Sequence, residues 1–411
     1  MLDEIIFFYP SYTLGGVQTL FIRTLNKLAK EGIRVGYCDF HDGTLRKSLK
    51  DNSEISYVTL DDIRNIKSNL IVTSANYMNV SKLIFHRDSK LLFWFLSPYN
   101  LPILNLSQKT NIDFKSINII DWMYNGFENI DYLLKKESVY FMDKLCFEIN
   151  GSPEVNYDSF LPLYIDMPEF DASFGEDSNC LNIAWIGRID LSVKYHCVVY
   201  LIEEFEKIKK CNKFKYVTLT IVGSGAGSED IKKMCKNLTC CDYINFIDNV
   251  EYSRFHKFIA SSFDVVFAHG TTCLESASVG VPTVCLDGSI NKMREGYRFK
   301  WLFKRPYYDI GRTEFDEDFS NIGSNLHDIL LDVIHRRSEI SIKCKNVVLN
   351  SFDSSEVINK IRHAFTKANA STRDVKLNWF TFFVDLIVCR VVLSKIFKIR
   401  LISLITKLNQ K

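Results

Sequence analysis

The sequence lacks an excess of charge of either sign. Its 51 Lys and Arg residues are balanced by 49 Asp and Glu residues, which leaves a formal net charge of +2 over 411 residues. A chain without an overall field has no long-range attraction for a polyanion, so we expect no nucleic-acid partner. An anionic ligand must instead be held by cations that are gathered locally.

The sequence also lacks the composition of a disordered or membrane-spanning chain. Apolar residues make up 47% and charged residues 24%, as in globular proteins, and the length predicts two domains or three small ones. In the apolar segment from Leu377 to Leu408, no stretch of about 18 residues is free of charge, so we expect no spanning helix there. Met1 leads directly into an apolar segment without a secretory signal, and we expect a reduced, cytoplasmic protein.

Metal-binding spacing is missing, although cysteine occurs twelve times. The densest group, Cys235, Cys240 and Cys241, lacks the Cys-x2-Cys or Cys/His pairs of a zinc site. We interpret these cysteines as small buried apolar residues. No Asp-x-Asp pair stands at a plausible strand end. We therefore expect no metal and no cofactor.

Short apolar segments alternate with helical patterns along most of the chain. This alternation predicts an α/β protein with two Rossmann-like, doubly wound domains. Predicted strands in the first half cover residues 5–9, 32–38, 69–73 and 91–96, with a helix over 17–30. Predicted strands in the second half cover residues 182–187, 217–222, 244–247, 264–268 and 283–286; helices are expected over 198–210, from 229, near 254–260 and from 274.

The polar segment of residues 161–179 has no clean periodicity and is typical of an interdomain connection. We assign residues 1–165 to the first domain, 178–350 to the second, and 351–375 to a terminal helix that packs back across the domains. We assign residues 376–411 to a basic amphipathic tail. The segment from Ser371 to the last residue contains eight Lys or Arg but only two Asp. This favours a helix lying in an anionic membrane interface. The alternative is a helix packed on the protein body.

Ligands of open α/β sheets bind beyond the carboxyl ends of the strands. Gly15 and Gly16 follow the first predicted strand, where a glycine loop and a helix N-terminus can approach an anion. Arg188 and Lys194 follow the first strand of the second half. Two cations in one such loop suit a diphosphate, although exposed cations are also common in solvated loops.

The glycine-rich segment that begins at Gly223 lacks the Gly-x-Gly-x-x-Gly spacing and the Lys-Ser/Thr pair of phosphate-binding loops. We interpret it as a structural or ligand-facing turn. The segment from Ala268 to Glu275 is more informative. Gly270 permits close approach, and Thr271 and Thr272 can cap the next helix. We expect Glu275 in the first turn of that helix, where it either caps the helix electrostatically or accepts hydrogen bonds from a ribose.

Together these segments resemble the glycosyltransferase B fold, and in particular the large retaining group 1, family 4-like glycosyltransferases, which include bacterial polysaccharide enzymes. The resemblance covers roughly residues 1–370 and is strongest in Trp185-Ile-Gly-Arg-Ile-Asp190 with Lys194, in Leu219–Gly225, in Ile244–Val250 and in Thr272–Val284. It implies that Gly15 and Gly16 lie beside the donor phosphates and the acceptor. It also implies that Arg188, Lys194, Gly270, Thr271 and Thr272 bind the diphosphate, that Glu275 binds the ribose, and that Gly223 and Val250 face the nucleotide.

One residue departs from the family pattern. The family places a second glutamate eight positions before the ribose glutamate, and Phe267 occupies that position here. Contacts to the transferred sugar must therefore differ, and His269 is the only candidate for a catalytic side chain nearby. No general base can be named in the first domain.

The resemblance implies a metal-independent glycosyltransferase that moves a hexose-like unit, with retention, from a nucleotide diphosphate sugar onto a glycan or lipid-linked acceptor. Bacterial surface polysaccharide biosynthesis (O-antigen, capsule or lipopolysaccharide) at the inner face of the cytoplasmic membrane is the simplest setting. Two alternatives remain open. One is a nucleotide-sugar epimerase of the same fold, and the other is a non-catalytic membrane-associated partner in glycan assembly, in which Phe267 marks lost activity.

Overall fold

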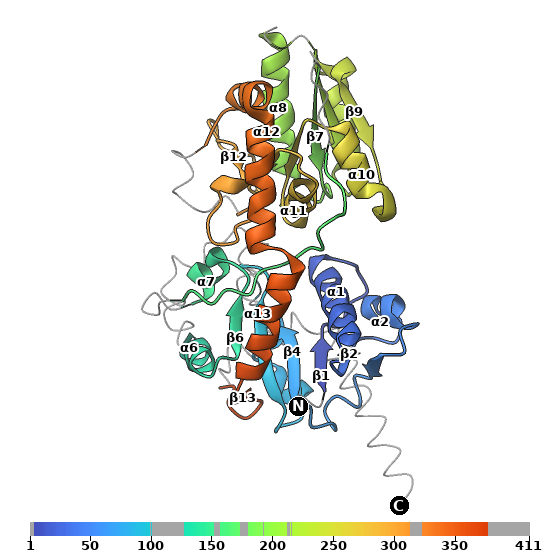
Figure 1. Cartoon of the computed structure of the whole chain (residues 1–411), viewed down its shortest axis with the longest axis vertical. Coiled ribbons are helices and arrows are strands. Elements are labelled where there is room, and N and C mark those ends of the chain that lie inside the picture. Colours follow the sequence, from blue (N-terminus) through green and yellow to red (C-terminus); the bar gives the residue numbers. More distant parts are fainter. Residues whose placement is uncertain are drawn as a thin grey trace, which may run out of the picture. The chain divides into compact units, whose positions relative to one another are not determined.

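The computed structural model describes residues 4–98, 100, 127–151, 157–172, 180–191, 193–211, 214, 216–312 and 323–376. The chain divides into two compact units (Figure 1). The first unit comprises the described residues of Met1–Leu163 and of Val357–Lys411, and the second is Tyr164–Glu356. The predicted membrane-binding tail lies outside the described residues, apart from Lys376.

The first unit is built on a mainly parallel sheet with the strand order β13-β5-β4-β1-β2-β3, and β6 also pairs with β5. Its interior is apolar because β1, β2 and β4 are buried along their whole length. The strands are β1 Ile5–Phe8, β2 Val35–Cys38, β3 Ile55–Val58, β4 Leu70–Ser74, β5 Lys90–Phe95, β6 Val139–Phe141 and β13 Ala370–Ser371. The helices are α1 Gly16–Lys30, α2 Thr44–Leu49, α3 Ser81–Ile84, α6 Phe127–Lys135, α7 Lys144–Asn150 and α13 Ser354–Lys367, with a 3-10 turn at Ala75–Tyr77.

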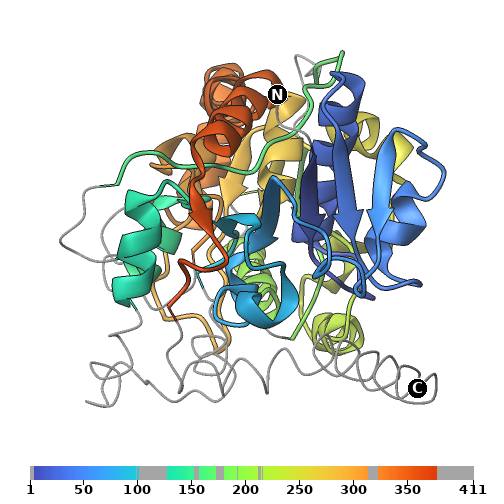
Figure 2. The ribbon, with the colours of Figure 1, turned by 90° about the horizontal axis from the view of Figure 1, so that it is seen from below.

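The end of the first unit differs from the single helix expected over residues 351–375. Helix α13 stops at Lys367, and the chain then forms β13, which pairs antiparallel with the start of β5 (Figure 2). The reason is tertiary: Ser138 Oγ accepts hydrogen bonds from the main-chain nitrogens of Asn369 and Ala370, which draws the chain to the sheet edge.

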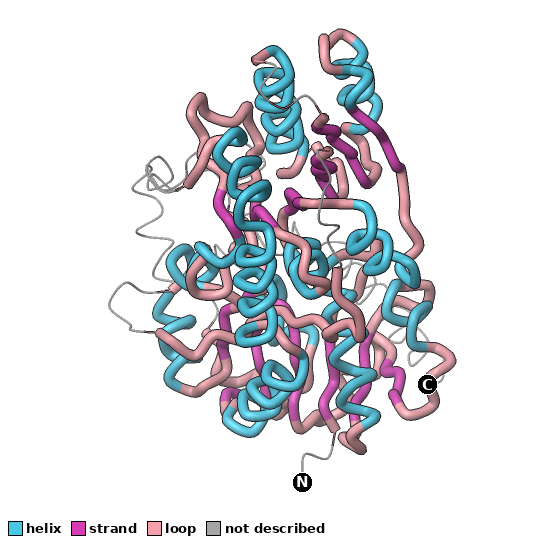
Figure 3. Tube along the Cα trace, turned by 45° about the horizontal axis from the view of Figure 1, so that its top comes forward, coloured by secondary structure: helices cyan, strands magenta, loops and turns pink. Residues whose placement is uncertain are grey.

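The second unit contains a six-stranded sheet with the order β12-β11-β10-β7-β8-β9, parallel except for β12. Helices flank its strands (Figure 3). The strands are β7 Leu181–Ile186, β8 Val217–Val222, β9 Ile244–Ile247, β10 Val265–Ala268, β11 Thr283–Cys285 and β12 Lys300–Trp301. The helices are α8 Tyr195–Lys210, α9 Ser228–Lys236, α10 Tyr252–Ser262, α11 Thr271–Ser278 and α12 Leu326–Ser351, with 3-10 turns at Cys241–Tyr243 and Leu302–Lys304.

Both units confirm the predicted α/β class and the parallel, doubly wound sheets. Every strand predicted from an apolar segment is present, and all of them except β9, which lies at the edge of its sheet, occupy positions between two other strands. Among the described residues, no helix has the length and apolar content needed to cross a membrane.

Candidate functional site

The sheet of the second unit changes its winding direction at β7. From β7 the chain adds β8 and then β9 on one side, and it later places β10 on the other side of β7. The loops after β7 and β10 therefore leave their strands in opposite directions, and ligands of such sheets bind at this point. The loop after β7 carries Arg188 and Lys194, and the loop after β10 carries His269 and Gly270.

Lys194 joins these two loops. It is the residue before α8, and its Nζ atom donates a hydrogen bond of 3.2 Å to the main-chain oxygen of His269. Burial lowers the pKa of Lys194, and the nearby positive charge of Arg188 lowers it further. The two predicted cations are thus close enough to repel each other. A bound anion would relieve this repulsion.

Neither cation is paired with a carboxylate in the described part of the chain. No ion pair or hydrogen bond involves the exposed Arg188 side chain there, and the one bond of the Lys194 ammonium leaves two of its three donors unused. Asp190 lies between them in sequence, but its Oδ1 accepts from the main-chain nitrogens of Val193 and Lys194. The loop after β7 therefore presents unpaired positive charge.

Helix α11 begins beside Lys194. Gly270 is its N-cap and has φ +82°, a conformation that favours glycine. The prediction that Thr271 and Thr272 cap this helix is wrong: Thr271 is the first helical residue, and no side chain accepts a hydrogen bond at the cap. The N-terminal amides and the positive end of the helix dipole are therefore available to an anion.

His269 has one ring nitrogen that can accept a hydrogen bond. Its Nδ1 lies 2.9 Å from the main-chain oxygen of Leu286, and a carbonyl can only accept, so the proton is on Nδ1. Burial and the charge of Lys194 lower the pKa of His269 to about 4, which keeps the ring neutral at pH 7. Its Nε2 is then unprotonated and, among the described residues, has no hydrogen-bond partner.

Glu275 lies in the second turn of α11, not in the first turn as expected, because the helix already begins at Thr271. Its side chain is nearly buried, and Oε2 lies 2.5 Å from Nε2 of His256 on α10. No sequence pattern singles out His256, since one histidine in an amphipathic helix is usually a surface residue. The pairing of these two residues is a product of the fold.

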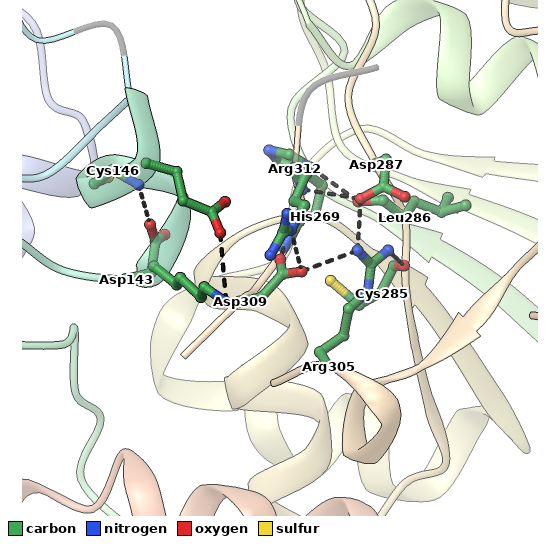
Figure 4. Close-up of polar contacts among 12 residues, drawn as sticks. Asp143, Cys146, His269, Cys285, Leu286, Asp287, Arg305, Asp309 and Arg312 are labelled. Carbon is green, nitrogen blue, oxygen red and sulfur yellow. Dashed lines mark hydrogen bonds and ion pairs between the residues drawn. The ribbon is translucent and has the colours of Figure 1, made fainter. Parts of the chain in front are cut away.

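A network of ion pairs around Arg305 lies close to His269 (Figure 4). Nη1 of Arg305 lies 2.7 Å from Oδ1 of Asp287 and 3.2 Å from Oδ2 of Asp309, and Nε of Arg312 lies 3.0 Å from the latter atom. These four charges neutralise one another. They fix the segment of residues 309–312, whose main chain hydrogen bonds to both Gly270 and Gly288. Sequence reasoning missed these residues, because they come from segments without regular periodicity.

The glycine-rich turn packs against the loop of Arg188. A Cβ atom at Gly223, which has φ +130°, would lie 2.1 Å from the main-chain oxygen of Gly187. The Ser224 oxygen accepts a hydrogen bond from the nitrogen of Ile189, and the Ile189 oxygen accepts one from Gly227. The turn thus restricts the conformation of the loop after β7, which carries Arg188. Contact of Gly223 with a nucleotide stays a prediction, as does that of half-buried Val250 beyond β9.

Phe267 is not at the edge of the sheet. It is the third residue of β10, is fully buried, and packs edge to face on Phe299 with ring centroids 5.3 Å apart. A carboxylate at this position would be buried in the core. The first side chain beyond the strand is that of His269.

Gly15 and Gly16 lie in the first unit at the corresponding change of winding, between β1 and β4. Gly15 is the N-cap of α1 and has no side-chain cap, and a Cβ atom on Gly16 would meet nothing within 4 Å. The loop before them is fixed by Asp39, whose Oδ1 accepts from the nitrogens of Ser11 and Phe40. No cluster of three or more potential metal ligands occurs among the described residues of either unit.

Residues 181–305 match the family model described as glycosyl transferases group 1. This segment contains the loop with Arg188 and Lys194, and also His269, Glu275 and Arg305. This segment of the second unit is similar to the group 1 glycosyl transferases. No curated protein matches the chain in sequence.

Solved structures with the glycosyltransferase B fold match most of the chain. The apo form of the lipopolysaccharide outer core galactosyltransferase WaaB is 10% identical, with a TM-score of 0.55 and coverage of 88% of this chain and 99% of that one. TarM of S. aureus, in complex with fondaparinux, α-GlcNAc-glycerol and UDP, is 9% identical, with a TM-score of 0.60 and coverage of 88% and 99%. Anabaena HepE, in complex with UDP and glucose, is 14% identical, with a TM-score of 0.53 and coverage of 89% and 99%.

Proposed function

We propose that this protein is a glycosyl transferase of group 1 that moves a hexose-like sugar from a nucleotide diphosphate sugar onto a glycan or lipid-linked acceptor. The observation that carries the proposal is the pair of unpaired cations, Arg188 and Lys194, beside the uncapped N-terminus of α11. The largest charge that develops during sugar transfer is on the leaving diphosphate. Preorganised cations and amides stabilise such a charge without a metal ion.

The other residues of the site take complementary roles. Glu275 accepts hydrogen bonds from the ribose hydroxyls. The unprotonated Nε2 of His269 accepts a hydrogen bond from a hydroxyl of the transferred sugar, a contact that a glutamate supplies in the resembling family. Since the pKa of His269 is about 4, its ring does not act as a general acid at neutral pH.

The setting we propose is bacterial surface polysaccharide assembly. The similar structures include a lipopolysaccharide galactosyltransferase, and TarM was solved with α-GlcNAc-glycerol and UDP. We assign the acceptor to the first unit, near Gly15 and Gly16, and retention of anomeric configuration to the reaction. The basic tail of residues 376–411 holds the enzyme at an anionic membrane surface.

A donor panel tests the proposal without knowledge of the acceptor. UDP, GDP and ADP sugars are screened by thermal shift with the wild type, Arg188→Ala and Glu275→Ala, with EDTA present, and Lys236→Ala on the exposed end of α9 as the control. We expect one nucleotide sugar to stabilise the wild type and the control but neither site variant. If no nucleotide sugar stabilises the wild type, the donor site is refuted and a non-catalytic role replaces it.

A further inference from the structure

His256 and Glu275 come from neighbouring helices that pack against each other, α10 and α11. The Nε2 atom of His256 lies 2.5 Å from Oε2 of Glu275. The histidine side chain is 19% exposed and the glutamate side chain 7%. The contact therefore lies at the border between the protein interior and the solvent. It involves Glu275, the residue of α11 that is proposed to bind the ribose.

A carboxylate that is nearly buried requires hydrogen-bond donors, since its desolvation is costly otherwise. Glutamate also has three side-chain torsions, so a contact from one helix alone leaves several rotamers open. A donor on a second helix restricts them. One hydrogen bond occupies only one of about four lone-pair positions on a carboxylate, so the bond from His256 is compatible with further bonds to a ligand.

His256 does not serve as a core-filling residue. In α10, which is described throughout, Ile259 is the only fully buried side chain. Tyr252, one turn earlier, is 63% exposed, and its ring centroid lies 6.0 Å from that of His256. Thus the face of α10 that reaches Glu275 is open to solvent at one end, as a ligand-facing surface requires.

We propose that His256 is a positioning residue for the donor. It donates from Nε2 to Glu275 and holds that carboxylate in the orientation that receives the paired hydroxyls of the nucleotide ribose. This inference rests on the proposed function, because it assigns the donor ribose to Glu275. It adds a second helix to the ribose site and makes ribose recognition depend on a residue that does not touch the nucleotide.

The test compares a ribonucleotide with its analogue that lacks both hydroxyls. The probes are whichever of UDP, GDP and ADP binds the wild type most tightly, and the 2′,3′-dideoxy form of that nucleotide. Dissociation constants are measured by titration calorimetry for the wild type, Glu275→Ala, His256→Leu, His256→Asn and His256→Gln. A glutamine amide reaches about as far as Nε2 of histidine, whereas an asparagine amide is too short. His256→Asn also serves if the leucine variant does not fold.

We expect the wild type to bind the ribonucleotide about tenfold more tightly than the dideoxy analogue, or more, because hydrogen bonds to a carboxylate are lost. Glu275→Ala, His256→Leu and His256→Asn should reduce this ratio to within about twofold of one, while His256→Gln should keep it. A merely structural histidine would lower stability and leave the ratio unchanged.

Two results overturn the inference, and they are distinguishable. If Glu275→Ala abolishes the preference but His256→Leu and His256→Asn keep it, the donor site stands and the positioning role is refuted. If the wild type binds none of the three nucleotides, the proposed function fails, and the inference fails with it.

Discussion

The ammonium of Lys194 lies 3.2 Å from the main-chain oxygen of His269, and this contact ties the loop after β7 to the loop after β10. It fixes a half-buried cation at the point where the sheet changes its winding direction. Because burial and Arg188 both lower the pKa of Lys194, this position is electrostatically unfavourable until an anion binds. Such local strain is typical of a binding site and not of a stabilising contact.

The first prediction follows for Lys194→Met. Loss of the ammonium removes a charge-assisted contact to the diphosphate, so the affinity for the nucleoside diphosphate should fall about tenfold or more. The stability of the free protein should change by less than about 1 kcal/mol, since the lost hydrogen bond is offset by relief of desolvation. Calorimetric titration and denaturant unfolding measure the two quantities. Lys236→Met is the control, and equal nucleotide affinity in both variants contradicts the assignment.

A second prediction concerns the pH dependence of stability at His269. The folded pKa is about 4, below the unfolded value of about 6.5, so the unfolded chain binds the extra proton between these values. Stability should therefore fall as the pH drops from about 6.5 to 4, by about 2–3 kcal/mol from this residue.

The variant His269→Asn isolates this contribution, since its amide can still donate to the Leu286 oxygen but does not titrate. Unfolding free energies of the wild type and of the variant are compared at pH 6.5 and 4.5. The wild type should lose more stability than the variant over this interval. Parallel losses would show that the histidine is not held neutral by its surroundings.

Much of the scaffold could be predicted from the sequence, and the reasons are local. β8 and β9 are found at the predicted residues 217–222 and 244–247, because β-branched and aromatic segments between turn residues favour the extended conformation. The start of α11 at Thr271, three residues before the predicted start, was missed, because the left-handed Gly270 and not a threonine hydroxyl begins the helix.

The support of the site could not be predicted, because it depends on contacts distant in sequence. The partners of Arg305 come from the end of β11 and from a turn that contains Asp309. No spacing in the sequence predicts that these side chains contact one another. The same holds for His256 and Glu275. By contrast, Arg188 and Lys194 were identifiable, since both follow one strand that is evident from its apolar segment.

A third prediction concerns the network around Arg305. Arg305→Ala leaves the carboxylates of Asp287 and Asp309 buried without this partner, which should cost about 3–5 kcal/mol of unfolding free energy. Arg336→Ala, which removes a solvent-exposed pair with Asp332, is the matched control and should change stability little. Denaturant unfolding measures both. Similar small losses would mean that the network adds no rigidity to the wall of the site.

A fourth prediction concerns the close approach of Gly223 to Gly187. Gly223→Ala combines an unfavourable positive φ with a Cβ clash against the Gly187 oxygen, and should cost about 3 kcal/mol and weaken nucleotide binding through the Arg188 loop. Gly296→Ala has a similar φ problem at +78° with nothing within 4 Å, and should cost about 1 kcal/mol. If both cost the same, the close approach is not a constraint.

A fifth prediction concerns the tail, which lies outside the described residues. Removal of the residues after Lys376 should release the protein from vesicles that contain anionic lipid, because most of the basic and aromatic side chains of the tail are lost. Sedimentation with vesicles at two salt concentrations measures this. Unchanged binding of the truncated chain would refute the interfacial helix.

The central claim is that Arg188 and Lys194 hold the diphosphate of a sugar donor during transfer. It is tested most directly by the slow, acceptor-free release of nucleoside diphosphate from the nucleotide sugar that binds, followed by NMR in EDTA for the wild type, Arg188→Ala and Lys236→Ala. We predict that the wild type and Lys236→Ala release the diphosphate and a sugar whose anomeric configuration is initially retained, and that Arg188→Ala does so at least about tenfold more slowly. Equal rates in Arg188→Ala and the wild type would contradict the account.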